Sequence, residues 1–453
     1  MSDAFDLVVI GGGNAGQAAA RTARAAGWSV ALVERDLVGG TCPNRGCVPK
    51  KVLVAAASVV DHVRRAQGHG VVGEARLDWT ALQAARHAIV DPLPGAMAKD
   101  LADQGVTLVR GSARFTGPGA LAVGDRALAA RAVVIATGSA PRALAMPGAA
   151  RAVTSAEVLA LPRVPRTAVF IGAGVVAFEL SHVLARAGCE RIVLLEPGAR
   201  PLPRSDADAI AALVAYSAST LGITVETGAQ VTALEAAAGD ETVVRYTTNT
   251  GAAARMTAAL VVNGAGRVPQ LADLDLARAG ITVAHDRVTL APDLRCVENP
   301  DVVIVGDANA DLPQLSPLAT SLGTLVAENL VHDRHIAPDL RTVASCVFTI
   351  PTLAQVGLTE EQAAAQGVAI TAKLTSGMAG WISSRTHHEE LAFAKVLIAP
   401  ATGLVVGAHL IGHGAEGNIH LLALAMRHGI RAADLATLDA AYPTDAADLR
   451  YLL

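Results

Sequence analysis

Short apolar runs alternate with alanine-rich helical segments over much of the chain. The segment "FDLVVIGGGNAGQAAARTARAAGWSVALVERD" (5–36) contains an apolar strand, a glycine turn, a helix and a second strand that ends in an acid. The segment "RTAVFIGAGVVAFELSHVLARAGCERIVLLEPG" (166–198) repeats this order. Strands that alternate with helices of this kind are typical of β-α-β units and a parallel sheet. The pattern therefore predicts an α/β protein with two Rossmann-like units.

The two units share the residue types that a dinucleotide requires. These are Gly11, Gly13, Gly16 and Glu34 in the first unit, and Gly172, Gly174, Ala177 and Glu196 in the second. The small residues allow a tight turn, close approach to a pyrophosphate and close helix–strand packing, while the acid accepts hydrogen bonds from a ribose. One such turn is weak evidence, but two complete units favour two dinucleotides, and a flavin with a nicotinamide is the commonest pair.

Two later stretches favour the flavin in the first unit. "AVVIATGSAPR" (132–142) predicts a buried strand that ends in a small-residue turn at Thr137 and Gly138. The segment 299–330 predicts an apolar strand that ends at Gly306 and Asp307, followed by a loop and a helix. An acid at such a strand end can bind a ribityl hydroxyl, and a helix N-terminus suits the flavin O2 region. Each stretch alone is equally consistent with an ordinary strand–loop junction.

Composition narrows the class of protein. A chain of 453 residues suggests two to four domains, and its 52% hydrophobic content with 3% aromatics reflects abundant alanine. No run approaches the roughly 18 apolar residues of a spanning helix, which argues against a membrane protein. The net charge of −4, without a basic block, argues against nucleic-acid binding. With no signal peptide and only five cysteines, we expect a cytoplasmic protein.

Two cysteines stand apart from the others in "GGTCPNRGCVPKK" (39–51). The C-x4-C spacing of Cys42 and Cys47 differs from zinc-ribbon pairs, and no other pair has ligand spacing, so we expect no metal. Nearby Arg45 and Lys50, together with a predicted helix after Cys47, would stabilise a thiolate. A thiolate is required for disulfide exchange or for charge transfer to a flavin. The remaining cysteines are predicted to be buried structural thiols: Cys189, Cys296 and Cys346.

This segment resembles the redox-active disulfide of the pyridine nucleotide-disulfide oxidoreductases, the family that includes glutathione reductase, dihydrolipoamide dehydrogenase and mercuric reductase. The resemblance covers essentially the whole chain, through both dinucleotide units, "ATGSAPR" (136–142), "GAGRVPQ" (264–270), "VGDA" (305–308) and "VFTIPTLAQVGLTEEQA" (347–363). It implies a homodimer in which each chain has a split FAD domain, a NAD(P) domain and an α+β interface domain. The expected boundaries are 1–145 with 265–335, then 146–264, and finally 336–453.

The resemblance also implies residue roles. Cys42 would attack the substrate as the interchange thiol, and Cys47 would be the charge-transfer thiol against the flavin. Lys50 and Glu179 match a buried ion pair beside flavin N5, although a solvated helical acid is the alternative for Glu179. Further residues that would contact a cofactor are Gly40, Thr41, Thr137, Gly138, Gly266 and Asp307. Electrons would pass from the nicotinamide through FAD and the Cys42–Cys47 disulfide to a small disulfide or another small oxidant.

The C-terminal tail "LDAAYPTDAADLRYLL" departs from the family pattern. Disulfide reductases of the family end in His-Pro-Thr followed by Glu, a dyad contributed by the other subunit. Here Tyr442 and Ala447 occupy those positions, and Asp448 comes one residue late. Tyrosine titrates near 10 and is a poor base at neutral pH, so Tyr442 either donates a hydrogen bond to a thiolate or only packs at a Tyr-Pro turn. Mercuric reductases also use tyrosine, but this tail lacks their cysteine pair.

Other histidines offer a substitute base or belong to the surface. They are those of "SSRTHHEE" (383–390), His413 and His420. The alternative substrates to a small disulfide are metal or metalloid thiolates and quinones, or a role as a dihydrolipoamide dehydrogenase-like subunit of a larger complex.

Predictions about the nicotinamide and substrate subsites depend on a few single residues. Glu196 favours NADH over NADPH because an acid repels a 2′-phosphate, whereas Arg200 and Arg204 could reach one. Val175 replaces the tyrosine that usually gates the nicotinamide in glutathione reductases. Arg21 matches an arginine near a glutathione carboxylate, or is a solvated helix residue.

Overall fold

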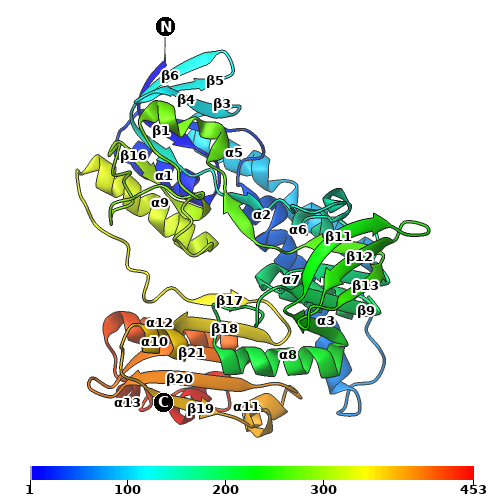
Figure 1. Ribbon diagram of the computed structural model, residues 1–453. Helices are drawn as coiled ribbons and strands as arrows, with labels where there is room; N and C mark the ends of the chain where they lie inside the picture. Colours follow the sequence, from blue (N-terminus) through cyan, green and yellow to red (C-terminus); the bar gives the residue numbers. More distant parts are fainter. Residues whose placement is uncertain (1–2) are drawn as a thin grey trace. The chain divides into compact units, whose positions relative to one another are not determined.

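A computed structural model describes residues 3–453 (Figure 1). The described chain divides into two compact units. The first comprises residues up to Lys50, Ala85–Arg142 and Arg267–Asp339, and the second comprises Lys51–Ala84, Ala143–Gly266 and Leu340–Leu453. α3 (Cys47–Ala66) and α4 (Trp79–Val90) contribute residues to both units.

The first unit is built on a sheet in the strand order β3-β2-β1-β6-β5-β4, with β16 also paired to β6. β1 lies parallel to β2 and β6, β2 lies parallel to β3, and β16 lies parallel to β6. Its strands are β1 (Asp3–Ile10), β2 (Val30–Glu34), β3 (Thr107–Arg110), β4 (Ala113–Gly117), β5 (Ala120–Val123), β6 (Arg126–Ile135) and β16 (Val302–Ile304). The parallel strands bring the ends of β1, β2, β6 and β16 to one edge of the sheet.

Helices α1 (Asn14–Ala25) and α9 (Ser316–Val331) lie side by side in the first unit (Figure 1). Small residues allow this approach: a Cβ on Gly323 would lie 2.2 Å from the Ala15 carbonyl oxygen. The unit also contains α2 (Thr41–Arg45) and α5 (Leu93–Asp103). A short antiparallel pair joins β7 (Ser139–Pro141) to β15 (Arg267–Pro269).

The second unit contains a parallel sheet in the order β10-β9-β8-β14 and a separate antiparallel sheet in the order β11-β12-β13. The parallel strands are β8 (Thr167–Ile171), β9 (Arg191–Glu196), β10 (Ile223–Thr227) and β14 (Leu260–Asn263). The antiparallel strands are β11 (Gln230–Ala236), β12 (Thr242–Thr247) and β13 (Ala253–Ala258). Helices α6 (Ser155–Leu159), α7 (Val175–Arg186) and α8 (Ala207–Leu221) accompany these sheets.

A five-stranded sheet in the order β17-β18-β21-β20-β19 forms the C-terminal part of the second unit. Its strands are β17 (Ser345–Val347), β18 (Thr352–Gly357), β19 (Thr371–Thr375), β20 (Phe393–Ala399) and β21 (Leu404–Gly412). Its helices are α10 (Glu360–Ala365), α11 (Ile382–Arg385), α12 (Ala415–His428), α13 (Ala432–Leu435) and α14 (Leu449–Leu452). Buried Ile419 and Leu422 of α12 pack against apolar residues of these strands.

These elements confirm the predicted fold class, with one mixed and one parallel sheet of the dinucleotide-binding type and an α+β C-terminal region. The division into two units differs from the three expected domains, and the expected domain boundaries stay a prediction. None of the helices in residues 3–453 combines the length and apolar character that a membrane span requires.

Candidate active site

The first glycine turn connects β1 to α1 and depends on the absence of side chains. Gly11 has a φ of +107°, and a Cβ there would lie 2.3 Å from the Ala136 carbonyl oxygen. A Cβ on Gly16 would lie 1.9 Å from the Gly11 carbonyl oxygen, so helix and strand pack at backbone distance. Gly40 approaches the same turn, since its Cβ would lie 2.9 Å from the Gly13 Cα. The backbone around the start of α1 therefore carries no side chain at these positions that would keep a ligand away from the helix N-terminus.

The second turn has the same construction between β8 and α7. Gly172 has a φ of +98°, and a Cβ there would lie 2.5 Å from the Gly264 carbonyl oxygen. A Cβ on Gly174 would meet nothing within 4 Å, which leaves room beside the N-terminus of α7. The third small residue, Ala177, is fully buried. Both turns thus meet the steric demands of a bound pyrophosphate.

Glu34 at the end of β2 and Glu196 at the end of β9 are held by the same kind of hydrogen bonds. Glu34 accepts hydrogen bonds from the backbone N–H of Gly12 and of Asp36, both at 2.7 Å. Glu196 accepts hydrogen bonds from the N–H of Ala173 and of Gly198, both at 2.8 Å. The glycine turn therefore orients its own acid, and each carboxylate keeps acceptor capacity for a ribose hydroxyl.

A solvent-open hollow of about 460 Å³ lies against the first turn. Six of the residues that line it are Gly11, Glu34, Arg35, Thr137, Gln270 and Asp273. The Thr137 hydroxyl donates a hydrogen bond to the Gln270 carbonyl oxygen at 2.7 Å, and Arg35 contacts the side chain of Gln270. The hollow places a carboxylate beside the glycine turn, as the sugar of a bound FAD requires.

The junction of β6 with β7 gathers polar groups near Asp307. Gly138 has a φ of +70°, and Ser139, which follows it, donates a hydrogen bond to the Asp307 carboxylate at 3.1 Å. Arg267 donates to the Ser139 side chain at 2.8 Å. Burial raises the pKa of Asp307 above its ordinary value. Gly266, with a φ of +93°, falls in the second unit, so its expected contact with FAD stays a prediction.

Cys42 of α2 and Cys47 at the start of α3 lie together, both as reduced thiols. Cys42 hydrogen-bonds Cys47, Ser316 and Asn14 through its side chain, and the Cys47 Sγ lies 3.4 Å from the Ser316 hydroxyl oxygen. The hydrogen bond to Cys47, followed by burial, raises the pKa of the Cys42 thiol. Asn14 and Ser316 are the first residues of α1 and α9. The N-terminal ends of three helices therefore surround the two sulfurs with favourable dipoles.

Sequence reasoning missed Asn14 and Ser316. Asn14 lies inside the glycine motif, at a variable position, and Ser316 lies 269 positions beyond Cys47 in the chain. A serine or asparagine at the start of a predicted helix was the only available signal, and such residues are common there for reasons of capping alone.

Lys50 and Glu179 are both buried, at 9% and 7% exposure. Glu179 accepts a hydrogen bond from the backbone N–H of Phe348 at 2.9 Å, so the alternative of a solvated helical acid is wrong. Lys50 belongs to the first unit and Glu179 to the second, and their pairing stays a prediction. Thr41 begins α2 beside the thiols and is exposed.

In the C-terminal tail, Tyr442 is exposed and Asp448 is buried. Tyr442 is 75% exposed, and the bond to Pro443 is cis. Asp448 is buried and accepts a hydrogen bond from the Ser383 hydroxyl, while burial raises its pKa. Asp448 is therefore occupied within its own unit and is not presented to solvent as a substitute for the missing glutamate.

Two arginines singled out in the sequence have acidic partners. Arg200 forms hydrogen bonds of 2.6 and 2.8 Å with the Glu361 carboxylate, and Arg21 bonds Asp100 at 2.7 Å. Cys189 and Cys296 are buried as expected, whereas Cys346 is only partly buried.

The two turns fit the cofactors that the sequence suggested: each has a cradle that a Cβ would fill and a fixed carboxylate at its rim. FAD would be held by Gly11, Gly13 and Glu34, and a nicotinamide dinucleotide by Gly172, Gly174 and Glu196. When bound, the flavin supplies hydride acceptance and two-electron transfer, which protein side chains lack.

Comparison with known proteins defines the class. Residues 5–323 match the family model described as pyridine nucleotide-disulphide oxidoreductase, and residues 343–450 match the dimerisation domain of the same family. The chain belongs to the pyridine nucleotide-disulphide oxidoreductase family. The predictions of the family and of a flavin-dependent, NAD(P)H-linked disulfide oxidoreductase are therefore confirmed.

Individual relatives carry several different names. A dihydrolipoyl dehydrogenase of Mycoplasma pneumoniae is 31% identical over 97% of this chain and 96% of its own length. A glutathione reductase of Burkholderia cepacia is 30% identical over 97% of this chain and 96% of its own length. A mercuric reductase of Lysinibacillus sphaericus is 28% identical over 99% of this chain and 82% of its own length. Near-equal identity to relatives with different substrates leaves the substrate to be inferred from the site.

Proposed function

We propose that this protein uses NADH and FAD to reduce a small disulfide through the Cys42–Cys47 pair. The observation that carries the proposal is the pair itself, adjacent and surrounded by the N-terminal ends of α1, α3 and α9. This environment favours negative charge on sulfur, as thiol–disulfide exchange requires.

The two thiols have unequal surroundings, which supports unequal roles. The pKa of Cys42 is raised by Cys47, and a negative charge on Cys47 contributes to that effect. A negative charge on Cys47 would therefore disfavour ionisation of Cys42. Loss of its proton makes Cys42 a nucleophile, and the bond it forms with substrate sulfur releases one thiolate. Cys47 then attacks Cys42, releases the second thiolate and restores the disulfide.

The side chains around the pair position it without taking electrons. Ser316 and Asn14 hydrogen-bond the Cys42 sulfur and favour its thiolate. Tyr442 is proposed to reach the pair of the other subunit and to donate a hydrogen bond there. The match of residues 343–450 to a dimerisation domain supports the homodimer that this role needs. We further propose a cytoplasmic location, where a reducing environment suits a catalytic thiol pair.

NADH is proposed as the electron donor because Glu196 stands at the rim of the second turn. Arg200, which could have countered it, is already bonded to Glu361. A 2′-phosphate would therefore meet a carboxylate without that compensating cation.

Oxidation of dihydrolipoyl groups is a second candidate, supported by the name of the Mycoplasma pneumoniae relative. The tail argues against it, since Tyr442 is a poor base for taking protons from a dithiol at neutral pH.

The test is an anaerobic titration of the FAD-loaded protein with NADH and, in parallel, NADPH. We expect a long-wavelength absorption between about 500 and 600 nm, from a thiolate in charge transfer with flavin. Glutathione disulfide, lipoamide, Hg(II) and a quinone are then added one at a time. Discharge by glutathione disulfide supports the proposal, and discharge by lipoamide alone supports the second candidate.

A matched pair of variants assigns the signal to the redox pair. Cys42→Ser should abolish turnover of the disulfide, while Cys346→Ser, which alters a thiol of β17, should leave the absorption and its discharge unchanged. Flavin bleaching without a long-wavelength band in the unmodified protein would overturn the relay and favour direct flavin chemistry.

A further inference from the structure

Three side chains from distant parts of the sequence converge in the second unit, separate from the redox pair. They are His62 of α3, Glu389 in the loop that follows α11, and His413 just before α12. One potential ligand atom from each lies within 4.8 Å of the other two. His62 and His413 are exposed, whereas Glu389 is only 8% exposed. The group therefore has a buried acid at its base and two imidazoles toward solvent.

A third imidazole borders the group. The ring of His387 stacks on that of His413 with centroids 3.9 Å apart, and the ring of His62 lies 5.7 Å from His413. Three imidazole rings therefore lie next to one another here, and a neutral imidazole has a lone pair to offer a metal ion.

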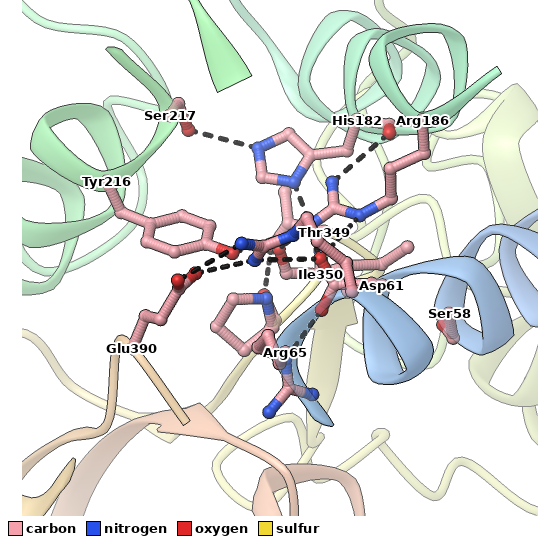
Figure 2. A network of polar contacts seen from close by, with 12 residues as sticks. Ser58, Asp61, Arg65, His182, Arg186, Tyr216, Ser217, Thr349, Ile350 and Glu390 are labelled. Atoms are coloured by element: carbon pink, nitrogen blue, oxygen red, sulfur yellow. Dashed lines mark hydrogen bonds and ion pairs between the residues drawn. The ribbon is translucent and has the colours of Figure 1, made fainter. Parts of the chain in front are cut away.

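The acid at the base is fixed by a chain of charged contacts. Arg65 lies 3.0 Å from the Glu389 carboxylate, and both side chains are at most 4% exposed. Arg65 also donates to the Asp61 carboxylate at 2.8 Å (Figure 2). It donates further to the backbone carbonyl of His387. Asp61 accepts two further hydrogen bonds from Arg186, at 3.0 and 2.8 Å. Partners of this kind orient ligands around a metal and contribute to affinity.

We propose that His62, Glu389 and His413 bind a divalent transition-metal ion of the zinc class. Two imidazole nitrogens with one carboxylate oxygen suit Zn²⁺, whereas Mg²⁺ and Ca²⁺ prefer all-oxygen sites. Donors about 2.0–2.2 Å from a tetrahedral zinc lie roughly 3.3 Å from one another. Both histidines are exposed and can rotate to close the remaining gap, while Glu389 stays in place. The solvent side leaves the fourth position for water or for His387.

A bound ion would connect α3 to two segments of the C-terminal region. The proposed ligands come from positions 62, 389 and 413. Residues 387–390 are otherwise held by Arg64 and Arg65, by backbone hydrogen bonds to α11 and by the stacking of His388 on His69. The ion would therefore stabilise this unit without joining the electron path. The proposed site does not depend on the proposed function. Zn²⁺ binding and disulfide reduction are measured by different readouts, so either proposal can fail without the other.

The test is Zn²⁺ binding to the full FAD-loaded protein in competition with a chromophoric chelator. Cys42 and Cys47 are kept as a disulfide, so that thiols do not bind the ion. We expect one equivalent per chain, unaffected by excess Mg²⁺, and a Zn²⁺-dependent rise of the melting temperature. His62→Ala and His413→Ala should each weaken binding at least about 100-fold, since even partners outside the ligand set are worth about 10- to 100-fold.

His420→Ala is the matched control, because it removes another exposed histidine of the same region, on α12. It should retain both the stoichiometry and the thermal shift. Glu389→Gln, which can still contact Arg65, should weaken Zn²⁺ binding while the melting temperature without zinc changes little. An unchanged affinity in the His62→Ala/His413→Ala double variant would overturn the proposal and show that the ion binds elsewhere.

Discussion

Tyr442 is 75% exposed within its own chain, so its hydroxyl is accessible to a partner. Asp448, one residue past the position of the family's glutamate, is buried against Ser383. The hydroxyl of Tyr442 is therefore limited to donating a hydrogen bond, and the proposed acceptor is a thiolate of the other subunit.

Replacement of Tyr442 by phenylalanine should lower kcat for disulfide reduction about tenfold. A hydrogen bond to a charged group is worth about 1.5–3 kcal/mol, and 1.36 kcal/mol corresponds to a factor of ten in rate. Steady-state kinetics with the disulfide as substrate would measure the loss, and the melting temperature would report any effect on folding. Tyr451→Phe, an exposed tyrosine in the same tail, serves as the control. An unchanged kcat would mean that Tyr442 has only a packing role.

At the scale of elements, the contact between α1 and α9 depends on one glycine. Gly323 lies in the middle of α9 and is buried, although glycine disfavours a helix by about 1 kcal/mol relative to alanine. The structure explains its presence, because a Cβ there would lie 2.2 Å from the Ala15 carbonyl oxygen. Both helices begin beside the redox thiols, so their spacing also positions Asn14 and Ser316.

Gly323→Ala should therefore lower the free energy of unfolding, by about 1–3 kcal/mol, as is typical when a side chain is forced into a packed contact. Gly417→Ala is the matched opposite case: Gly417 is an exposed helical residue of α12 whose added Cβ would meet nothing within 4 Å. That substitution should raise stability by up to about 1 kcal/mol. Urea unfolding followed by circular dichroism measures both changes, and equal effects of the two substitutions would contradict the steric argument.

At the scale of the whole molecule, a buried polar network links stability to pH (Figure 2). His182 of α7 is fully buried; its Nδ1 accepts a hydrogen bond from the Ile350 N–H at 3.1 Å. Its Nε2 lies 3.0 Å from the hydroxyl oxygen of Ser217, which donates to the Leu213 carbonyl. Nε2 must then be the donor, so both ring nitrogens are satisfied only in the neutral imidazole. Burial lowers the pKa of His182 to about 3.

Stability should consequently fall as the pH falls from about 6.5 toward 3. In that window the unfolded chain binds a proton at His182 and the folded chain does not. Protonation therefore favours the unfolded state and lowers the free energy of unfolding, by up to roughly 5 kcal/mol. Burial raises the pKa of Glu389 to about 7. Between about 4.5 and 7 the folded chain therefore binds a proton at Glu389 that the unfolded chain releases, so this group stabilises the fold as the pH falls. The two contributions partly cancel in the unmodified protein.

A comparison of variants separates the contributions of His182 and Glu389 to the pH dependence of stability. Urea unfolding at pH 7.5, 6 and 5 should show a smaller acid-induced loss of stability for His182→Gln, which keeps Glu389, than for the unmodified protein. His420→Gln, which removes an exposed histidine, should follow the unmodified protein. If His182→Gln showed the same acid-induced loss as the unmodified protein, another group would be responsible for it.

The sequence by itself determined the fold class and both glycine turns with their acids, and it predicted Cys42 and Cys47 as the redox pair. These features are local: a strand, a turn and a helix that follow one another carry their own pattern of apolar and small residues. It also predicted a helix after Cys47 and the replacement of the family histidine by Tyr442.

Only the tertiary structure decided which distant residues share a site. Ser316 reaches the sulfurs from 269 positions away, Asp448 turns inward to Ser383, and His62 meets Glu389 and His413 across more than 300 positions. Spacings along the chain predicted no metal, because positions 62, 389 and 413 are too far apart to form a ligand motif. Side chains that meet through the packing of separate elements leave no periodic signal, because their proximity depends on the backbone path and not on local sequence.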